Sequence, residues 1–339
     1  MPVQHPNDPF RFVQATRAIN HIPNIYGRYR QSGLFTAGMN DAGSTTLRFQ
    51  RVNNTLVLVP QKSRGEDGTM QADEGREFLY MEIPHFPLHD QVSPEAVRGK
   101  VDFLTGKEVD TFANKKARVM MKHRNAMAIT EEHLMAGAIK GVIQNEAGAT
   151  IYNLFNQFGV TKKTIDFDFT TETTDINAVC KSVLRHIEDH LEGDVMSGVQ
   201  VYTSPEFHDA LVSHPEVQKA YANYQEAANR IGGDNRVGFT FGGLTFSEYT
   251  GKANGTAGVS DFIDTGKAQA FPLGTQEVFK LFPGPPVLNG INNVNMAVSA
   301  PMYALEKADD LGRWVDMYSE LNVLPVCLKP LTIVELTMS

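Results

Sequence analysis

The stretch "HIEDH" holds two histidines whose spacing could support metal chemistry. On a helix, His186 and His190 lie four residues apart and share one face, so a single metal ion could reach both. The zinc-hydrolase motif with this spacing requires a glutamate directly after the first histidine, and here Ile187 takes that place. We interpret the pair as part of a solvated helix surface, and a metal-dependent hydrolase is the remote alternative.

Three further sets of residues have suitable types for chemistry, but none completes a site. Cys180 and Cys327 lie in apolar surroundings and are predicted to be buried free thiols. Asp166 and Asp168 alternate along one strand face, which an exposed strand edge explains better than acid–base catalysis. The glycine-rich run "GGDNRVGFTFGG" lacks the lysine–serine or lysine–threonine end of a phosphate-binding loop. We therefore expect no enzymatic activity, no metal and no cofactor.

The bulk composition is that of an acidic globular protein. Its 339 residues are 42% hydrophobic and 21% charged, which is enough for buried cores in more than one domain. A formal net charge of -8 argues against a basic face that binds nucleic acid. The first residues show neither the basic nor the apolar region of a signal peptide. No apolar run approaches the roughly 18 residues needed to span a bilayer.

Residues 61–77 form a polar insert between two apolar, strand-like runs, Leu56–Val59 and Phe78–Ile83. A compact domain seldom carries so long an irregular loop without a function. Fixing its backbone costs on the order of 17–34 kcal/mol, and the insert has almost no apolar surface to offset this. The insert therefore either stays mobile or lies against another subunit. In the second case the contact would be made by its eight charged side chains: Lys62, Arg64, Glu66, Asp67, Asp73, Glu74, Arg76 and Glu77.

The segments around the insert predict strands. "TTLRFQRV" and "TLVLVP" are separated by Asn53-Asn54, a pair that tolerates the positive φ of a tight hairpin turn. The return strand is expected to end at "IPHFPLHD", where Pro84 and Pro87 should stop the ladder. Residues 1–44 are polar and aperiodic, and they predict an extended arm.

The longest predicted helix covers residues 108–140, which contain no proline. Charged residues, Glu132 among them, are expected on its solvent face. His123, His133 and His208 lie beside charges on predicted helices and are interpreted as surface or boundary residues. Apolar residues recur every seven positions and form one stripe: Ala113, Met120, Met127 and Leu134.

Residues 175–275 are predicted to form a self-contained α+β unit. Asp175 and Ser204 are expected to cap the starts of helices. The glycine pair Gly242-Gly243 is expected to turn a β-hairpin, and a second hairpin should turn at 145–148.

This order of parts resembles the major capsid proteins of tailed bacteriophages, and among them the phage lambda major capsid protein E family. The similar segments are "LVLVPQKSRGEDG" followed by "FLYMEIPHFPLHDQVSPEAVRG", then "AFPLGTQEVF", and finally "LPVCLKPLTIVEL". Each segment is weakly specific, but their shared order extends over residues 10–337.

The resemblance implies an α+β Hong Kong 97-like capsid fold. Residues 1–44 would be an N-terminal arm, 45–92 an extended-loop hairpin, 93–174 and 276–339 a peripheral domain with a spine helix, and 175–275 an axial domain. The implied function is structural: hexamers and pentamers close an icosahedral shell around phage double-stranded DNA, with the extended loop over a neighbouring subunit.

Partners and location follow from the same resemblance. It implies a scaffold, a portal and a small decoration protein, only weak and non-specific contact with DNA, and assembly in the bacterial cytoplasm into a virion capsid. Some members of the fold crosslink a lysine of the extended loop to an asparagine of a neighbour. Lys62 lies on this loop, but the sequence identifies no carboxylate to catalyse that reaction.

Two other classes of protein remain as alternatives. An encapsulin-like compartment shares the fold and also forms a cage. A non-assembling binding module would stay a monodisperse monomer, so light scattering separates it from both cages.

Overall fold

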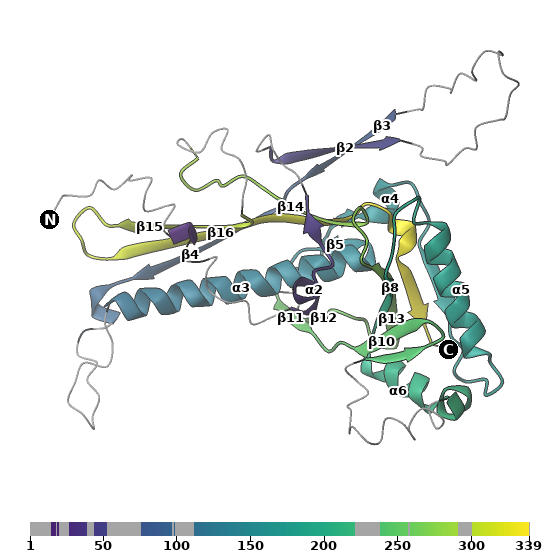
Figure 1. The fold of residues 1–339 in the computed structure, drawn as a ribbon. Helices are drawn as coiled ribbons and strands as arrows, with labels where there is room; N and C mark the ends of the chain where they lie inside the picture. The colour runs from purple at the N-terminus through teal and green to yellow at the C-terminus, as the bar shows by residue number, and fades with distance from the viewer. Residues whose placement is uncertain are drawn as a thin grey trace, which may run out of the picture. The chain divides into compact units, whose positions relative to one another are not determined.

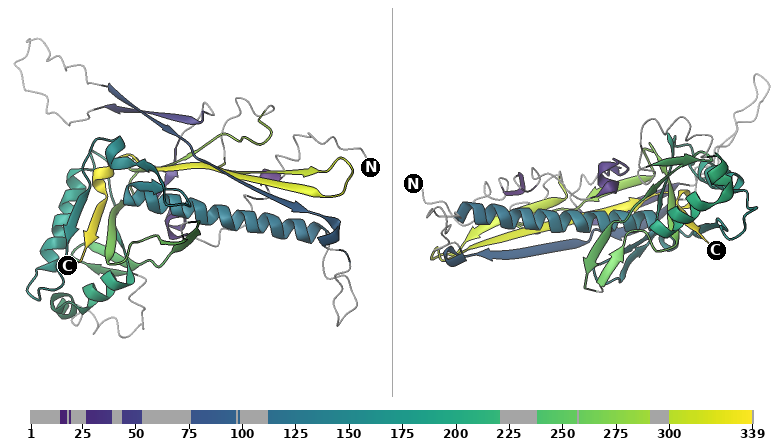
Figure 2. Two further views of the ribbon diagram at one scale, coloured as in Figure 1. Left: turned by 180° about the vertical axis from the view of Figure 1, so that it is seen from behind. Right: turned by 90° about the horizontal axis from the view of Figure 1, so that it is seen from below.

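The computed structural model describes residues 15–17, 19, 27–38, 44–52, 76–96, 98, 112–220, 238–256, 258–290 and 300–338. The chain divides into two compact units, each assembled from three separate segments (Figures 1 and 2). Unit 1 comprises Met1–Leu47, Glu82–Leu134 and Leu281–Pro325, and unit 2 comprises Arg48–Met81, Met135–Lys280 and Val326–Ser339. Segments distant in the sequence therefore share one core in each unit.

A five-stranded sheet built around the long strand β16 is the main feature of unit 1. Strand β16 pairs antiparallel with both β15 and β4, and the strand order is β1-β14-β16-β15 with β4 joined to β16. The strands are β1 (Thr36–Ala37), β4 (His85–Val92), β14 (Phe279–Pro283), β15 (Met302–Ala308) and β16 (Val315–Cys327).

Strand β4 corrects a prediction from the sequence. Pro84 and Pro87 are predicted to stop the ladder, yet Pro87 lies inside β4, which pairs with β16 from His85 to Val92. The proline is tolerated because β16 is the only strand that β4 pairs with among the described residues, so an N–H on its other edge is not needed. The prediction that these prolines stop the ladder is therefore wrong, because a strand that pairs along one edge only can contain a proline. The short η1 helix (Pro94–Ala96) follows β4.

Helix α3 (Phe112–Lys140) is the long helix predicted from the sequence. Its 29 residues span about 44 Å at a rise of about 1.5 Å per residue. In unit 1 it runs beside β4, β15 and β16 (Figures 1 and 2). Met120, Met127 and Leu134 are buried as predicted, whereas Ala113 is exposed. No helix among the described residues has the length and apolar character needed to cross a membrane.

Two polar side chains of α3 contradict the predicted solvent face. Glu132 and His123 are each only 2% exposed, and on helix α6 His208 is 3% exposed. His133 is half-buried, as expected of a boundary residue. The seven-residue pattern marks one stripe only, whereas α3 is buried over a wider face, so polar residues beside the stripe are covered as well.

The polar insert is flanked by a two-stranded ribbon, β2 (Thr46–Val52) paired with β3 (Arg76–Glu82). The strand predicted at Phe78–Ile83 is thus confirmed. The predicted turn at Asn53-Asn54 and the run Leu56–Val59 lie outside the described residues.

The segment 27–38 belongs to the core of unit 1, although the sequence predicts an irregular arm there. It contains the short helix α2 (Arg28–Gln31) and strand β1. Tyr29 is 1% exposed and Leu34 is 5% exposed. The main-chain N–H of Gly38 donates to the carbonyl oxygen of Leu281 at 2.8 Å, which extends the sheet pairing.

A six-stranded mixed sheet, in the order β7-β17-β13-β8-β10-β9, forms the centre of unit 2. Strands β7 and β17 lie outside the predicted self-contained range 175–275, so that range does not contain the whole sheet. The strands are β7 (Lys163–Asp166), β8 (Gly198–Thr203), β9 (Phe239–Phe241), β10 (Leu244–Glu248), β13 (Lys267–Leu273) and β17 (Val334–Thr337).

The local turns and caps of unit 2 agree with the sequence. Asp175 accepts a hydrogen bond from the N–H of Ala178 at the start of α5 (Ile176–Asp189), and Ser204 caps α6 (Pro205–Ser213) in the same way. Gly242 and Gly243, with φ of 58° and 87°, turn the β9–β10 hairpin. The other short elements are β5 (Val142–Gln144), β6 (Thr150–Asn153), α4 (Leu154–Gln157), β11 (Lys252–Gly255), β12 (Gly258–Asp261) and η3 (Pro330–Thr332).

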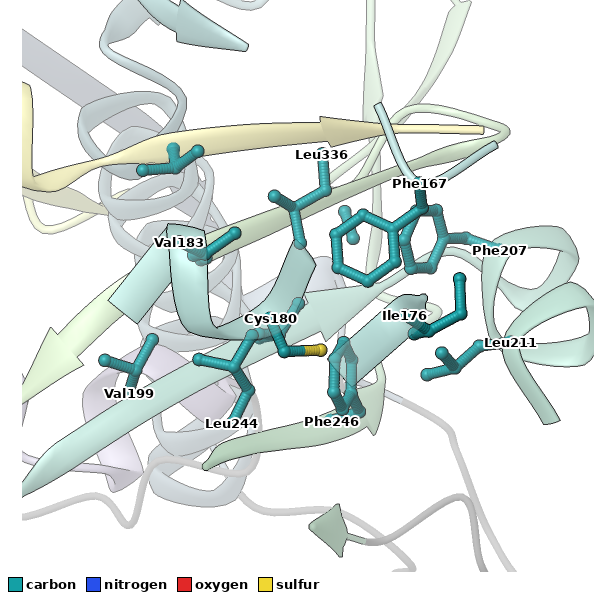
Figure 3. Close-up of a cluster of buried hydrophobic side chains, with 14 of the residues drawn as sticks. Phe167, Ile176, Cys180, Val183, Val199, Phe207, Leu211, Leu244, Phe246 and Leu336 are labelled. Carbon is teal, nitrogen blue, oxygen red and sulfur yellow. The ribbon is translucent and has the colours of Figure 1, made fainter. Parts of the chain in front are cut away.

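The core of unit 2 lies between the sheet and helices α5 and α6 (Figure 3). Phe207 packs edge-on against Phe167, with ring centroids 5.4 Å apart, and Phe167 meets Phe246 at 6.4 Å. All three rings are fully buried. Leu336 from β17 joins the same cluster, so the C-terminal strand is part of this core.

Candidate functional site

The two histidines of "HIEDH" make hydrogen bonds to main-chain carbonyl groups. His186 Nε2 lies 3.1 Å from the carbonyl oxygen of Leu331, and His190 Nδ1 lies 2.7 Å from that of His186. Among the residues that the structure describes, no group of three or more histidine, cysteine or acidic side chains could hold a metal ion. His190 therefore holds the C-terminal end of helix α5, and His186 links that helix to Leu331.

The two cysteines are buried free thiols, as the sequence predicts. Burial raises the pKa of the Cys180 thiol to about 12, and it does the same for Cys327. A thiol acts as a nucleophile through its thiolate form. At neutral pH neither side chain is ionised, so neither has the chemistry of a catalytic cysteine.

The two aspartates near β7 do not form an acid–base pair. Asp166 is the last residue of β7, at the sheet edge, and accepts a hydrogen bond from the hydroxyl of Thr337 at 3.1 Å. Asp168 lies beyond the strand and accepts from the hydroxyl of Thr170 at 2.8 Å. Both carboxylates thus organise the chain around them.

Only two of the eight predicted contact residues fall within the described chain: Arg76 and Glu77 begin strand β3. Lys62, Arg64, Glu66, Asp67, Asp73 and Glu74 lie outside the described residues.

The outer face of the β2–β3 ribbon carries a feature that sequence analysis missed. Phe78 is 39% exposed and Tyr80 is 58% exposed, and the guanidinium of Arg48 lies 3.8 Å from the centroid of the Phe78 ring. Met81 and Ile83 alternate with them and are buried. The alternation of Phe78, Tyr80 and Glu82 against Leu79, Met81 and Ile83 is the signal that could have predicted this aromatic face.

In unit 1, a buried histidine links helix α3 to two strands. His123 Nε2–H donates to Asp90 at 3.2 Å, and the hydroxyl of Ser319 donates to His123 Nδ1 at 3.0 Å. Lys122 holds the pKa of Asp90 below its usual value, and burial lowers the pKa of His123, so the neutral ring takes this tautomer. The order serine–histidine–aspartate is that of a hydrolase triad, but Ser319 is 2% exposed and has no access to a substrate. The arrangement is a structural tie between α3, β4 and β16.

A buried carboxylate, Glu320 of β16, holds the loop that follows β14. It accepts hydrogen bonds from the main-chain N–H groups of Val287 at 2.8 Å and Leu288 at 3.2 Å. The amide of Asn322 donates to the carbonyl oxygen of Pro285 at 2.8 Å. Burial raises the pKa of Glu320 above its usual value despite the two donors. The sequence signal is a single acid inside the apolar strand "MYSELNVLPVC", because a buried carboxylate needs hydrogen-bond donors from elsewhere in the chain.

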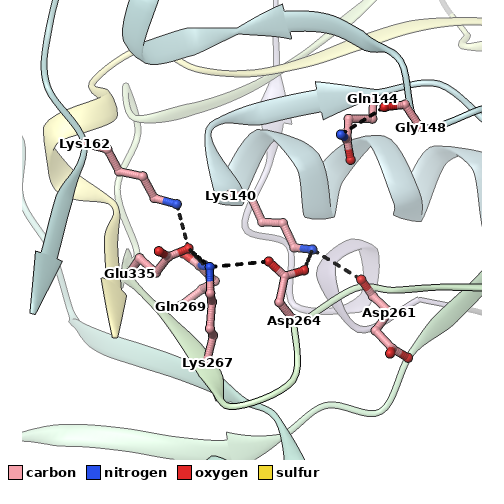
Figure 4. A network of polar contacts seen from close by, with 9 residues as sticks. All are labelled: Lys140, Gln144, Gly148, Lys162, Asp261, Asp264, Lys267, Gln269 and Glu335. Atoms are coloured by element: carbon pink, nitrogen blue, oxygen red, sulfur yellow. Dashed lines mark hydrogen bonds and ion pairs between the residues drawn. The ribbon is translucent and has the colours of Figure 1, made fainter. Parts of the chain in front are cut away.

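Unit 2 contains an ion-pair network around the C-terminal strand (Figure 4). Glu335 of β17 accepts a hydrogen bond from Lys162 Nζ at 2.6 Å and lies 3.4 Å from Lys267 Nζ. Burial by itself would raise the pKa of Glu335, but the two lysines outweigh it and the pKa lies below the usual value. The residues of the network are Lys140, Lys162, Asp264, Lys267, Gln269 and Glu335.

We expect Glu335→Gln to weaken unit 2 by about 1–3 kcal/mol at neutral pH, because it removes the charge from these hydrogen bonds. A carboxylate whose pKa is lowered by folding stabilises the fold above its unfolded pKa, and this stability is lost as the pH falls through the folded pKa. Urea denaturation followed by hydrogen exchange of β13 and β17 should therefore show a smaller loss of stability on acidification in the variant than in the native chain. Glu277→Gln is the control, because Glu277 lies in the same unit and is exposed in its ion pair with Lys280. If Glu335→Gln loses as much stability on acidification as the native chain, Glu335 is not the group responsible.

Comparison with known proteins places these features in a family context. A family model described as "Phage major capsid protein E" matches residues 12–338. The major capsid protein of Pseudomonas phage KPP10 is 28% identical over 352 aligned positions, covering 98% of this chain and 98% of the relative. The major capsid protein of Salmonella phage Felix O1 is 27% identical over 356 positions, covering 96% and 95%.

Solved structures show the same fold at low sequence identity. The capsid of Myoviridae phage XM1 is similar with a TM-score of 0.52 at 10% identity, covering 95% of this chain and 98% of that chain. The mature capsid of bacteriophage PhiM1 also has a TM-score of 0.52, at 13% identity, covering 93% and 87%. The buried contacts of His123 and Glu320 and the exposed aromatic face of the ribbon thus belong to a fold that these capsid chains share.

Proposed function

This chain belongs to the phage major capsid protein E family, and from that premise we propose that many copies of it assemble, as hexamers and pentamers, into the icosahedral shell that encloses packaged double-stranded DNA. The observation that carries the proposal is the match of the family model over residues 12–338. The chain also has the α+β Hong Kong 97-like fold of solved phage capsids.

The insert 61–77 and the ribbon at its base are the proposed contact with a neighbouring subunit. Aromatic residues and arginine are enriched where proteins meet, and Phe78, Tyr80 and Arg48 supply both on the exposed face of the ribbon. The charges of both signs on the insert favour register and specificity over raw affinity. Ordering the insert against a second copy would offset its entropy cost through contacts that one chain alone does not provide.

The domain roles follow from the same proposal. Residues 1–44 act as the N-terminal arm, of which the segment 27–38 is packed into the core of unit 1. Residues 45–92 act as the extended-loop hairpin, and 93–174 with 276–339 as the peripheral domain. Residues 175–275 supply the axial domain, and β7 and β17 complete its sheet. The chain has two compact units, which supports two main bodies, although unit 2 also takes in residues 135–174 and 326–339 of the proposed peripheral domain.

The further partners are a scaffold, a portal and a small decoration protein, with assembly in the bacterial cytoplasm. Contact with the packaged DNA is weak and non-specific, because a formal net charge of -8 opposes it.

The test is whether the purified full chain forms closed particles. Light scattering and negative-stain electron microscopy of the concentrated protein should show uniform shells tens of nanometres across. A monodisperse monomer at every concentration would overturn the proposal. Uniform shells that contain no DNA, in cells that make no phage heads, would favour the encapsulin-like alternative.

A further inference from the structure

The face of the unit 1 sheet that points away from helix α3 carries an ordered row of aromatic and polar side chains. Asp90 of β4 and Ser319 of β16 both contact His123 of α3. Successive residues of a strand point to opposite faces of the sheet, so His89 and Tyr318, each one position earlier, lie on the other face. These two residues are direct partners in the β4–β16 pair, and their rings stack in parallel with centroids 4.4 Å apart.

One carboxylate, that of Asp316, holds three side chains of this face in place. It accepts hydrogen bonds from His89 Nε2–H at 3.1 Å, from Gln91 Nε2 at 3.3 Å and from Trp314 Nε1 at 3.3 Å. The side chain of His89 is 51% exposed, and Trp314 and Tyr318 are half-buried. The rings are therefore fixed in position while part of each still faces water.

A second carboxylate, that of Asp309, orders the turn between β15 and β16. It accepts two hydrogen bonds from the guanidinium of Arg313, at 2.8 and 3.3 Å, and one from the main-chain N–H of Leu311 at 3.3 Å. The guanidinium carbon of Arg313 lies 4.3 Å from the centroid of the Trp314 ring. Leu311 is 76% exposed. The turn thus presents an arginine, a tryptophan and a leucine in one fixed arrangement.

The exposed side chains of this face and this turn have the composition of a protein-binding surface. Tryptophan, tyrosine and arginine are the residues that most often carry the binding energy where two proteins meet. Side chains that are already fixed lose less conformational freedom when a partner binds. We call this surface the aromatic seat, and its residues are His89, Leu311, Arg313, Trp314 and Tyr318.

Assembly into rings requires a surface of this kind. Each copy in a ring of five or six identical subunits meets the next head to tail, so each needs two different contact surfaces. The exposed face of the β2–β3 ribbon, with Arg48, Phe78 and Tyr80, is one of them in the proposed assembly. The surface that receives it must lie elsewhere on the same chain. Residues that dominate binding tend to meet similar residues of the partner, so an aromatic ribbon favours an aromatic receiving surface.

We propose that the aromatic seat receives the β2–β3 ribbon of a second copy of this chain, with Trp314 at the centre of the contact. The inference rests on the proposed assembly and names the surface that the ribbon meets. Asp309 and Asp316 are positioning residues, because they act on the contact through the side chains that they hold.

The fluorescence of Trp314 tests the seat directly, because the chain contains one tryptophan. In the unassembled full chain acrylamide should quench this fluorescence readily, since part of the ring faces water. In purified shells of the same chain the quenching constant should fall several-fold, and the emission maximum should move to shorter wavelength. Failure to form any particle overturns the proposed assembly itself. Particles in which Trp314 is quenched as readily as in the free chain overturn the seat alone.

Paired substitutions test whether the ribbon is the segment that meets the seat. Trp314→Leu and Tyr80→Leu should each raise the protein concentration needed for shell formation by about tenfold or more, as expected of residues that dominate an interface. The double variant should need little more than the worse single variant, because both changes remove the same contact. Trp314→Phe keeps an aromatic ring and should assemble closer to the native concentration than Trp314→Leu.

Met121→Ala is the matched control, because Met121 is a 48% exposed apolar residue of unit 1 on helix α3, away from the seat. Whatever effect it has on assembly should add to that of Tyr80→Leu. Urea denaturation of each variant reports whether the subunit is folded. The proposal is overturned if folded Trp314→Leu assembles at the native concentration, or if the effects of Trp314→Leu and Tyr80→Leu add in full.

Discussion

Deletion of residues 61–77 is expected to abolish shell formation while the chain stays soluble and folded. The buried residues that the structure describes in units 1 and 2 all lie on other parts of the chain, so the deletion leaves them in place. The deleted insert carries eight charged side chains that we propose to contact a neighbouring subunit. Without those contacts the ribbon has little to hold it on a second copy, because a two-stranded ribbon alone is marginal.

The measurement is negative-stain electron microscopy beside light scattering, on native and deleted chains at equal concentration. Circular dichroism and urea denaturation confirm that the deleted chain is folded. A variant with a glycine–serine segment of the same length in place of 61–77 separates chain length from side-chain contacts, and it too should form no shells. If the deletion variant forms closed shells, the insert is not required for assembly, and the assignment to the family is unaffected.

Truncation of Phe207 to alanine is expected to destabilise unit 2 by about 3–5 kcal/mol, the range typical of deleting a buried aromatic ring. Phe207 is fully buried, and its ring meets Phe167 at 5.4 Å and Phe169 at 5.1 Å, both nearly edge-on. The variant loses the transfer free energy of the ring and leaves a cavity that α6 and the sheet cannot close. This is a large fraction of the stability of an ordinary domain.

Urea denaturation monitored by hydrogen exchange of β8 and β13 measures this loss. Val195→Ala is the matched control, because Val195 belongs to the same unit but is 76% exposed, and its truncation should cost less than about 0.5 kcal/mol. Equal midpoints for the two variants would show that Phe207 is not a central part of the core. Because assembly requires folded subunits, Phe207→Ala should also reduce the yield of shells.

Several elements of the fold were predictable from short stretches of sequence. Asp175 and Ser204 start helices, and Gly242-Gly243 turns a hairpin, because caps and tight turns depend on residues within three or four positions of each other. The apolar stripe at Met120, Met127 and Leu134 predicted α3 for the same reason. The resemblance to a capsid family likewise rested on the order of such local segments.

Pairing between distant segments was not predictable in this way. Pro87 was expected to end a strand, but the outcome depended on whether β4 pairs on one edge or two. Strands β7 and β17 complete the sheet of unit 2 although they lie outside the range that the sequence indicated. A single strand's sequence does not state its neighbours, since the same alternation fits an edge or a central position.

For the candidate contact surface too, some features follow from the sequence and others only from the tertiary structure. By itself, the sequence determined that residues 61–77 are polar, charged and too long for an idle loop, because composition and length are local properties. Only the tertiary structure decided that Phe78 and Tyr80 face outward, that His123 is buried, and that Glu132 caps a helix 103 positions away. The reason is physical: whether a side chain is buried, and which group it must satisfy, is set by the segments that pack against it, and those come from elsewhere in the chain.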